Sequence, residues 1–427
     1  MEQLIISGRR RLQGSIAVSG AKNAALAVIP AALCAGAPCV IDNLPVIDDV
    51  FNYVDILRRL GAGCDFLDRN TLRIDPSSAA PIPADFDSAR KIRASYYVLG
   101  ALLGRFGEAA VTLPGGCNFG SRPIDLHIKG FEALGAEVRI EHGIVYARAD
   151  RLVGAHVYLN ASVGATINVM LAAINAEGVT VIENAAREPH VVDVANFLNF
   201  IGADIKGAGT DTIRISGKEP LRGGDYTIIP DMIETGTYMI AGAVTGGDVT
   251  VSNIIPKHME SLTSKLKEMD CGIEEGEDAI RVMARGQLSP ASIKTQVYPG
   301  FPTDLQPQMT ALLATINGAS SMTETVFDNR FQYIGELERL GAKITLEGRT
   351  ALIDGGVALT GAEVTATDLR GGIALIIAGL SAYGETRLNN VHYVDRGYED
   401  FEDKLRYLGA DITRRETAVF EIPAGIL

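Results

Sequence analysis

The sequence predicts an α/β protein built from two domains of three repeats each. Three observations indicate this: the length of 427 residues, a tripeptide similar to Leu-Gly-Ala that recurs along the chain, and an alternation of strand-like and helix-like segments around each copy. At about 150 residues per domain, the length favours two to three domains. Hydrophobic residues make up 47% of the chain and charged residues 21%, which allows a sizeable core and argues against general disorder.

The tripeptide marks the end of a helix in each repeat. Consecutive copies lie 67 to 74 residues apart, and their middle residues are Gly61, Gly135, Gly202, the degenerate Asp270, Gly341 and Gly409. Before each copy, apolar residues repeat on one helical face, as Leu262, Leu266 and Met269 do. Glycine directly after a helix suits the C′ position, which needs a positive φ. We therefore expect an amphipathic helix to end at each copy and a strand to follow it.

The order within one module is strand, loop, helix, strand, loop, helix, strand. The third module illustrates it with a strand over 157–159, an apolar helix over 167–176, a strand over 179–182 and a second helix that ends at Ile201. Six modules of this size are too large for a solenoid repeat and too alike for unrelated domains. Two domains of three modules each are the expected arrangement.

The expected limits are residues 21–229 for the first domain and residues 1–20 plus 230–427 for the second. Two strands near the N-terminus, over 4–7 and 15–18, and one near the C-terminus, over 418–422, belong to no module. We expect them to pair and to close one domain. The second domain is then discontinuous in sequence.

The composition limits the partners and the location that we expect. The net charge of −13 works against non-specific binding to nucleic acid or anionic lipid. Five cysteines without a close pair favour a reducing compartment, and the N-terminus lacks a secretory signal pattern, so a cytoplasmic location is expected. The uncharged stretch 24–41 is interrupted by Pro30, Gly36 and Pro38, which favours a buried helix plus strand over a membrane span.

Loops that precede helices hold most of the notable cations. Free N–H groups at helix N-termini attract anions, so this placement predicts a multiply charged anionic ligand. The cations are Lys22, Arg93, Arg122, Arg187, Lys257, Arg330, Arg370 and Arg396. Any one of them alone could be an ordinary surface charge. Some could also be paired, because the same loops contain Asp231, Glu234, Asp304, Asp328, Asp368 and Asp395.

One glycine-rich loop, over 113–125, contains Cys117 and leads into a helix. Near a helix N-terminus and cations a thiolate is favoured, so Cys117 is a candidate nucleophile or proton donor. The alternative is an incidental cysteine on a surface loop. The other cysteines, Cys34, Cys39, Cys64 and Cys271, have the surroundings of buried small hydrophobic residues. The sequence has no dinucleotide-binding glycine motif, no P-loop and no histidine pair at metal-ligand spacing.

Several motifs together resemble the UDP-N-acetylglucosamine enolpyruvyl transferase family, also called UDP-N-acetylglucosamine 1-carboxyvinyltransferases, and the resemblance spans the whole chain. The motifs are Ser-Gly-Ala-Lys-Asn-Ala at 19–24, Ile-Arg-Ala-Ser at 92–95, Pro-Gly-Gly-Cys at 114–117, Ser-Arg-Pro-Ile-Asp at 121–125, Glu-Asn-Ala-Ala-Arg-Glu-Pro at 183–189, Phe-Pro-Thr-Asp at 301–304, Ala-Thr-Asp-Leu-Arg at 366–370 and Asp-Arg-Gly-Tyr at 395–398. The resemblance implies a fold of two inside-out α/β barrels, each of three repeats.

The resemblance also implies an activity. The enolpyruvyl group of phosphoenolpyruvate would pass to the 3-hydroxyl of UDP-N-acetylglucosamine with release of phosphate, as the first committed step of peptidoglycan precursor synthesis. No metal or organic cofactor is implied, and the expected partners are the two small-molecule substrates, with no nucleic acid or membrane.

Residue roles carry over by motif match. Phosphoenolpyruvate would be bound by Lys22, Asn23, Arg122 and Arg396. Cys117 would donate a proton to the methylene carbon and would be the target of fosfomycin. Asp304 would accept the proton of the sugar hydroxyl, and Asp368 would assist around the tetrahedral intermediate. The UDP-sugar would contact Arg93, Arg122, Pro123, Ile124, Asp125, Leu126, Ser162, Val163, Gly164, Asp304 and Val326.

Some positions depart from the usual residues of the family, and they leave alternatives open. The departures are Asp48, Asn160, Met232 and the pair Gly371-Gly372. They concern nucleotide affinity and domain closure, so an enolpyruvyl transferase for another nucleotide and a catalytically silent UDP-sugar-binding paralogue remain as alternatives. The sister enzyme that acts on shikimate phosphate lacks the cysteine loop. Tyr96 and Tyr97 lie in a helix that resembles the second paralogue of some Gram-positive bacteria.

Overall fold

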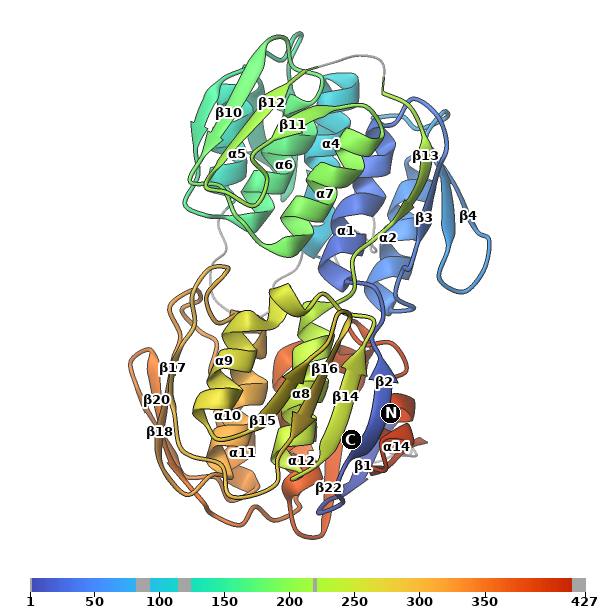
Figure 1. Ribbon diagram of the computed structural model, residues 1–427. Coiled ribbons are helices and arrows are strands. Elements are labelled where there is room, and N and C mark those ends of the chain that lie inside the picture. The colour runs from blue at the N-terminus through green and yellow to red at the C-terminus, as the bar shows by residue number, and fades with distance from the viewer. Residues whose placement is uncertain (1, 82–92, 114–123, 218–220, 417–427) are drawn as a thin grey trace, which may run out of the picture. The chain divides into compact units, whose positions relative to one another are not determined.

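The computed structural model describes residues 2–81, 93–113, 124–217 and 221–416. Contacts within the chain divide it into two compact units (Figure 1). Unit 1 consists of Met1–Val18, Met232–Gln296 and Gly300–Leu427, and unit 2 consists of Ser19–Asp231 and Val297–Pro299. The grouping of Val297–Pro299 with unit 2 was not expected. The domain limits of 21–229 and 1–20 plus 230–427 stay a proposal.

Unit 2 contains three sheets in the described residues, one for each of its modules. In sheet order the strands are β13 (Gly224–Thr227), β3 (Cys39–Asp42), β5 (Leu72–Asp75) and β4 (Gly63–Phe66); β6 (Glu108–Thr112), β8 (Ile144–Arg148) and β7 (Glu137–Glu141); and β11 (Asp204–Lys206), β12 (Thr212–Ser216), β10 (Val179–Glu183) and β9 (His156–Tyr158). The helices are α1 (Lys22–Ala31), η1 (Ala32–Cys34), α2 (Asp48–Arg59), η2 (Arg93–Tyr96), α4 (Tyr97–Phe106), α5 (Asp125–Ala133), α6 (Val163–Ala173) and α7 (Pro189–Phe200).

Unit 1 likewise contains three sheets in the described residues. In sheet order the strands are β15 (Gly272–Glu275), β16 (Ala279–Met283), β14 (Asp248–Ser252) and β2 (Gln13–Ala17); β17 (Ser292–Lys294), β18 (Gly318–Thr323), β20 (Thr350–Gly355) and β19 (Ile344–Glu347); and β21 (Glu363–Thr365), β22 (Glu385–Asn389), β1 (Glu2–Ser7) and β23 (Asp411–Glu416). The helices are α8 (Met232–Val244), η3 (Pro256–Met259), α9 (Glu260–Glu268), η4 (Thr303–Leu305), α10 (Gln306–Ala314), α11 (Ile334–Arg339), α12 (Leu369–Ser381), α13 (His392–Asp395) and α14 (Phe401–Tyr407).

In each unit the most apolar helices form the interior and the sheets lie outside them (Figure 1). In unit 1, α8, α10 and α12 contact one another, and in unit 2, α4 contacts both α1 and α6. These helices are buried almost all round, as expected for helices that are apolar on every face. The observed arrangement confirms the predicted fold class of two inside-out α/β barrels with three repeats each.

The recurrent tripeptide ends helices as predicted. Gly61, Gly135, Gly202, Gly341 and Gly409 all have positive φ, between 90° and 119°. After α2, the amide of Gly61 donates to the carbonyl of Arg58 and the amide of Ala62 donates to that of Leu57, which is the Schellman pattern. The degenerate copy adopts the same conformation, because Asp270 has a φ of 64°.

Two details of the modules differ from the sequence expectation. The first five modules end in a two-stranded hairpin instead of one strand, as β7 and β8 show, and the turn between these two has positive φ at His142 and Gly143. The described part of the last module ends in β23, which pairs with β1. The N-terminal strands also join different sheets: β1 pairs with β22 and β23, whereas β2 pairs with β14. The expected strand over 418–422 lies outside the described residues.

The uncharged stretch 24–41 forms a buried helix followed by a strand, as predicted, in α1, η1 and β3. None of the described helices combines the length and the apolar character needed to cross a membrane. The four cysteines predicted to be buried, Cys34, Cys39, Cys64 and Cys271, are buried as free thiols.

Candidate active site

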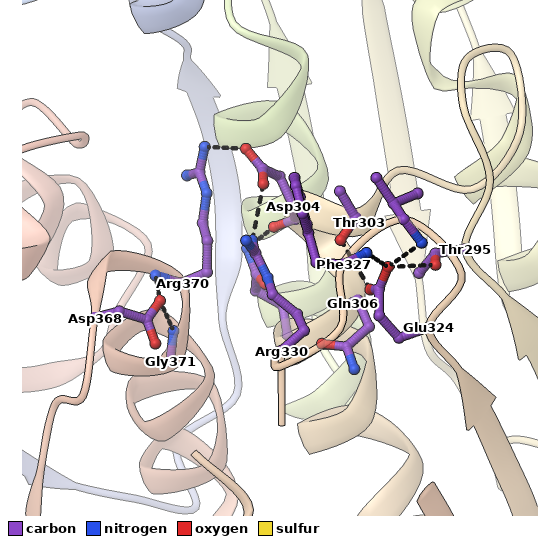
Figure 2. Close-up of polar contacts among 12 residues, drawn as sticks. Thr295, Thr303, Asp304, Gln306, Glu324, Phe327, Arg330, Asp368, Arg370 and Gly371 are labelled. Carbon is purple, nitrogen blue, oxygen red and sulfur yellow. Dashed lines mark hydrogen bonds and ion pairs between the residues drawn. The ribbon is translucent and has the colours of Figure 1, made fainter. Parts of the chain in front are cut away.

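Asp304 lies in η4 of unit 1 between Arg330, from the loop after β18, and Arg370, from the first turn of α12 (Figure 2). Its Oδ1 accepts a hydrogen bond from Nη2 of Arg330 at 2.8 Å, and its Oδ2 accepts one from Nη2 of Arg370 at 2.9 Å. The arginine side chains are only 4% and 7% exposed, whereas that of Asp304 is 26% exposed. Two charge-assisted bonds therefore orient a carboxylate that solvent still reaches.

Hydrogen bonds hold Arg370 both at its guanidinium group and at its backbone amide. Its Nη1 donates to the hydroxyl of Tyr398 at 3.1 Å, and that hydroxyl also bonds to Oγ1 of Thr237 at 2.8 Å. At the backbone, Oδ1 of Asp368 accepts from the amides of Arg370 and Gly371 at 2.9 and 3.1 Å and thereby caps α12. Asp368, predicted near the reaction intermediate, thus sits at the start of the helix from which Arg370 projects.

A buried carboxylate that was not predicted from the sequence lies beside this cluster. Glu324 is 1% exposed and follows β18. It accepts hydrogen bonds from Thr303, which precedes Asp304, and from the backbone amide of Val326, a predicted UDP-sugar contact. A carboxylate one residue past a strand, followed by a polar loop, was the only signal for it in the sequence.

Arg396 directly follows α13 and is half-buried. Its neighbour Asp395 is engaged with β23: both oxygens of Asp395 accept from Arg414, at 2.7 and 3.0 Å, and Arg414 also binds Glu402. Asp395 therefore serves as a structural ion-pair partner, which is one of the alternatives left open for the acidic residues.

Lys22 begins α1 in unit 2 and is paired with a carboxylate. Its Nζ lies 2.7 Å from Oδ2 of Asp49, and the two side chains are 10% and 4% exposed. Its backbone amide donates to Oδ2 of Asp231 at 2.9 Å, and Asn23 follows in the first turn of α1. Asp49 was not among the predicted residues, because only the fold brings the start of α2 to the start of α1.

The predicted UDP-sugar segment 162–164 opens α6. Ser162 caps this helix through Oγ, which accepts from the amide of Ala165 at 3.4 Å. The ring of His127 lies so close to Gly164 that a Cβ at 164 would be 3.0 Å from it, so any larger residue at 164 would press against this ring. Burial lowers the pKa of His127 to about 4, and its Nδ1 is 2.7 Å from Nδ2 of Asn168. The imidazole is therefore neutral near pH 7.

The second predicted UDP-sugar segment opens α5, which packs against α6. Ile124 is buried, Asp125 is exposed and Leu126 is half-buried. Two helix N-termini of unit 2 therefore carry the two predicted segments, and the amides of first turns favour an anionic ligand.

Several predicted residues fall outside the described part of the chain. These are Cys117, Arg122 and Pro123, and for Arg93 the described part is the backbone in η2. Among the remaining predicted cations, Lys257 is 75% exposed and pairs with Glu260, as expected for an ordinary surface charge.

Comparison with known proteins gives consistent results. A family model described as EPSP synthase (3-phosphoshikimate 1-carboxyvinyltransferase) matches residues 6–405. The UDP-N-acetylglucosamine 1-carboxyvinyltransferase 3 of Caldanaerobacter subterraneus subsp. tengcongensis is 55% identical over 415 residues, which cover 97% of this chain and 99% of that protein. The UDP-N-acetylglucosamine 1-carboxyvinyltransferase of Clostridium botulinum is 54% identical over 97% of this chain and 100% of its own length.

Solved structures share the fold over nearly the whole length. The enolpyruvyl transferase NikO from Streptomyces tendae has a TM-score of 0.88 at 28% identity and covers 98% of this chain and 99% of its own. An EPSP synthase from Acinetobacter baumannii has a TM-score of 0.76 at 19% identity, with 97% and 100% covered, which is a likeness of fold alone.

Proposed function

The chain belongs to the EPSP synthase family, among the UDP-N-acetylglucosamine 1-carboxyvinyltransferases, and on this premise we propose the reaction that it catalyses. It transfers the enolpyruvyl group of phosphoenolpyruvate to the 3-hydroxyl of UDP-N-acetylglucosamine and releases phosphate. This is the first committed step of peptidoglycan precursor synthesis. A cytoplasmic location and the independence from metal and organic cofactors are part of the same proposal.

The reaction needs two proton transfers and the binding of several anionic groups. In the addition step, the sugar oxygen forms a bond to C2 of phosphoenolpyruvate, its proton passes to a base, and the methylene carbon receives a proton. In the elimination step, the bond between C2 and the phosphate oxygen breaks, phosphate leaves with the electron pair, and the former methylene carbon loses a proton to restore the double bond. A positioned carboxylate and a proton-donating side chain supply this chemistry.

Asp304 is our candidate for the base that accepts the sugar proton. The observation that supports this most strongly is the fixation of both its oxygens by Arg330 and Arg370 while 26% of its side chain stays exposed. A base must hold one orientation and yet be reached by the substrate. Asp368 stabilises the start of the helix that presents Arg370 and in this proposal assists around the tetrahedral intermediate.

The remaining roles rest on motif match. Cys117 donates the proton to the methylene carbon, and the phosphate and carboxylate of phosphoenolpyruvate are bound by Lys22, Asn23, Arg122 and Arg396. Arginine is suited to both groups because its planar fork forms paired hydrogen bonds. For the UDP-sugar, the helix starts at 124–126 and 162–164 offer backbone amides to its anionic groups, and the contacts further include Arg93, Arg122, Pro123, Asp304 and Val326.

Phosphate release tests the proposal. The chain is incubated with phosphoenolpyruvate alone and together with UDP-N-acetylglucosamine, before and after treatment with fosfomycin. Sugar-dependent release that fosfomycin abolishes in the wild type, but not in Cys117→Ser, supports both the reaction and the cysteine role.

Two other outcomes decide for the alternatives. Faster release with another uridine nucleotide than with UDP-N-acetylglucosamine indicates a different acceptor, in line with the unusual Asn160 and Met232. Binding of the UDP-sugar without any phosphate release indicates a silent paralogue.

A further inference from the structure

The side chain of Glu324 is 1% exposed and accepts four hydrogen bonds. Its Oε1 accepts from Oγ1 of Thr295 at 2.9 Å and from the amides of Val326 and Phe327 at 2.7 and 3.1 Å. Its Oε2 accepts from Oγ1 of Thr303 at 2.8 Å. Burial of a carboxylate is costly unless donors surround it, so this arrangement ties together the segments that supply the donors.

These donors come from three separate segments of unit 1 (Figure 2). Thr295 directly follows β17, Thr303 is the first residue of η4, and Val326 and Phe327 lie in the loop after β18. Only the second and third segments lead to the candidate base. Glu324 thus links the segment after β17, which holds no candidate site residue, with the two segments that carry Asp304 and Val326.

The contacts around Asp304 form a closed ring. Glu324 binds Thr303, and Thr303 is the chain neighbour of Asp304. Asp304 accepts from Arg330, whose guanidinium lies 5.4 Å from the ring centre of Phe327. The amide of Phe327 returns to Glu324. A displacement of Glu324 would therefore move both partners of the pair between Asp304 and Arg330.

We propose that Glu324 is a positioning residue for this reaction. Its carboxylate fixes the position of the turn that carries Asp304 relative to the loop that carries Val326. The candidate base therefore stays in place relative to the loop that is proposed to contact the sugar. Glu324 acts through these residues and touches no reacting atom. This inference rests on the proposed function, because it presupposes that Asp304 acts on the bound sugar.

Two threonine hydroxyl groups donate to the carboxylate of Glu324, and removing them one at a time distinguishes a positioning role from a purely structural one. Thr303→Val removes the bond at Oε2 and releases the turn of Asp304, while Thr295 and both backbone amides keep their bonds to Oε1. Thr295→Val removes a bond of similar length at Oε1, and it also deprives the amide of Thr325 of its acceptor at a residue that is 0% exposed. A structural role therefore predicts the larger effect for Thr295, and a positioning role predicts the larger effect on turnover for Thr303.

The experiment compares wild type, Thr303→Val, Thr303→Ser and Thr295→Val by phosphate release at varied UDP-N-acetylglucosamine and by urea unfolding. Thr303→Val should lower kcat about tenfold to a hundredfold, the range expected when a catalytic group shifts by an ångström or less. Its KM for the sugar should stay within about threefold, because ground-state binding is retained. Thr303→Ser should recover most of the lost turnover. Thr295→Val should keep kcat within about threefold of wild type while lowering the urea midpoint more than Thr303→Val does.

Glu324→Gln provides a second variant that keeps the shape of the side chain. Its amide oxygen can accept the three bonds at Oε1, and its amide nitrogen can donate to the hydroxyl of Thr303, so turnover should exceed that of Thr303→Val. Equal losses of kcat in Thr303→Val and Thr295→Val, no recovery in Thr303→Ser, or a turnover of Glu324→Gln below that of Thr303→Val would each overturn the proposal. A wild type without sugar-dependent phosphate release would instead refute the proposed function, before any variant is compared.

Discussion

The substitution Asp304→Asn removes the charge of the candidate base and keeps its shape. One carboxylate oxygen becomes an NH2 group that faces an arginine donor, so one of the two short bonds to Arg330 and Arg370 is lost and the other is weakened. Hydrogen bonds to charged groups contribute about 1.5–3 kcal/mol each. The arginine side chains are only 4% and 7% exposed, so water can replace little of the hydrogen bonding that they lose, whereas the side chain of Asp304 is 26% exposed. We therefore expect the free energy of unfolding of unit 1 to fall by about 2–4 kcal/mol.

The same substitution should affect turnover much more than binding. Loss of a general base lowers kcat by about 10²–10⁴-fold. The KM for UDP-N-acetylglucosamine should change less than about fivefold, because Asp304 acts mainly in the transition state. Phosphate release gives both kinetic constants, and urea unfolding gives the stability.

Asp248 offers a matched control in the same unit. Its side chain is 27% exposed and also binds two arginines, Arg281 at 2.7 and 2.9 Å and Arg285 at 3.1 Å, but these are 39% and 68% exposed. Asp248→Asn should leave kcat unchanged and reduce stability less. If Asp304→Asn retains kcat and raises only KM, Asp304 is a binding residue and the assignment of the base is wrong.

Three further substitutions test the roles of Cys117, Asp49 and Asp193. Cys117→Ser should lower kcat near neutral pH by at least about tenfold, because a hydroxyl is a weaker acid than a thiol; unchanged turnover in the phosphate assay would exclude the proton-donor role. Asp49→Asn removes the negative charge that lies 2.7 Å from the ammonium of Lys22, so the KM for phosphoenolpyruvate should rise and the free energy of unfolding should fall by about 3 kcal/mol. A stable variant with unaltered kinetics would contradict this role of Asp49. Burial raises the pKa of Asp193 to about 6, outweighing the hydrogen bond from Tyr226, so the folded state binds the proton more tightly than the unfolded state does. As the pH rises from about 4 to about 6, the wild type should therefore lose up to about 3 kcal/mol of its free energy of unfolding. Urea unfolding at pH 4 and pH 7 should show this loss in the wild type but not in Asp193→Asn. Equal pH dependence in both proteins would refute the prediction.

The repeat was predictable because it depends on local chemistry. A glycine after an amphipathic helix needs only its own chain neighbours to adopt positive φ, and Gly61 and Gly409 do so as expected. The degenerate copy behaves alike because aspartate tolerates the left-handed region better than most residues, as Asp270 shows. The interior helices were predictable for a similar reason, since a helix that is apolar on every face must be buried.

The pairing of charges was not predictable, because it depends on which loops the fold brings together. Lys22 and Asp49 are 27 positions apart in sequence, yet their side chains form one of the most buried ion pairs of unit 2 among the described residues. In the sequence Glu324 is only one of several carboxylates that follow a strand, and its role emerges from the convergence of Thr295, Thr303 and the loop at 326–327. Sequence alone could propose Asp304 as a base but could not show what orients it.

In the proposed reaction, an enolpyruvyl group passes to the sugar of UDP-N-acetylglucosamine. The most direct measurement is the identification, by chromatography and mass spectrometry, of the nucleotide formed when the chain is incubated with phosphoenolpyruvate and UDP-N-acetylglucosamine. We expect a new nucleotide with the mass of the 3-enolpyruvyl ether, formed in equal amount to the released phosphate. An unchanged UDP-N-acetylglucosamine, with or without consumption of phosphoenolpyruvate, would contradict it.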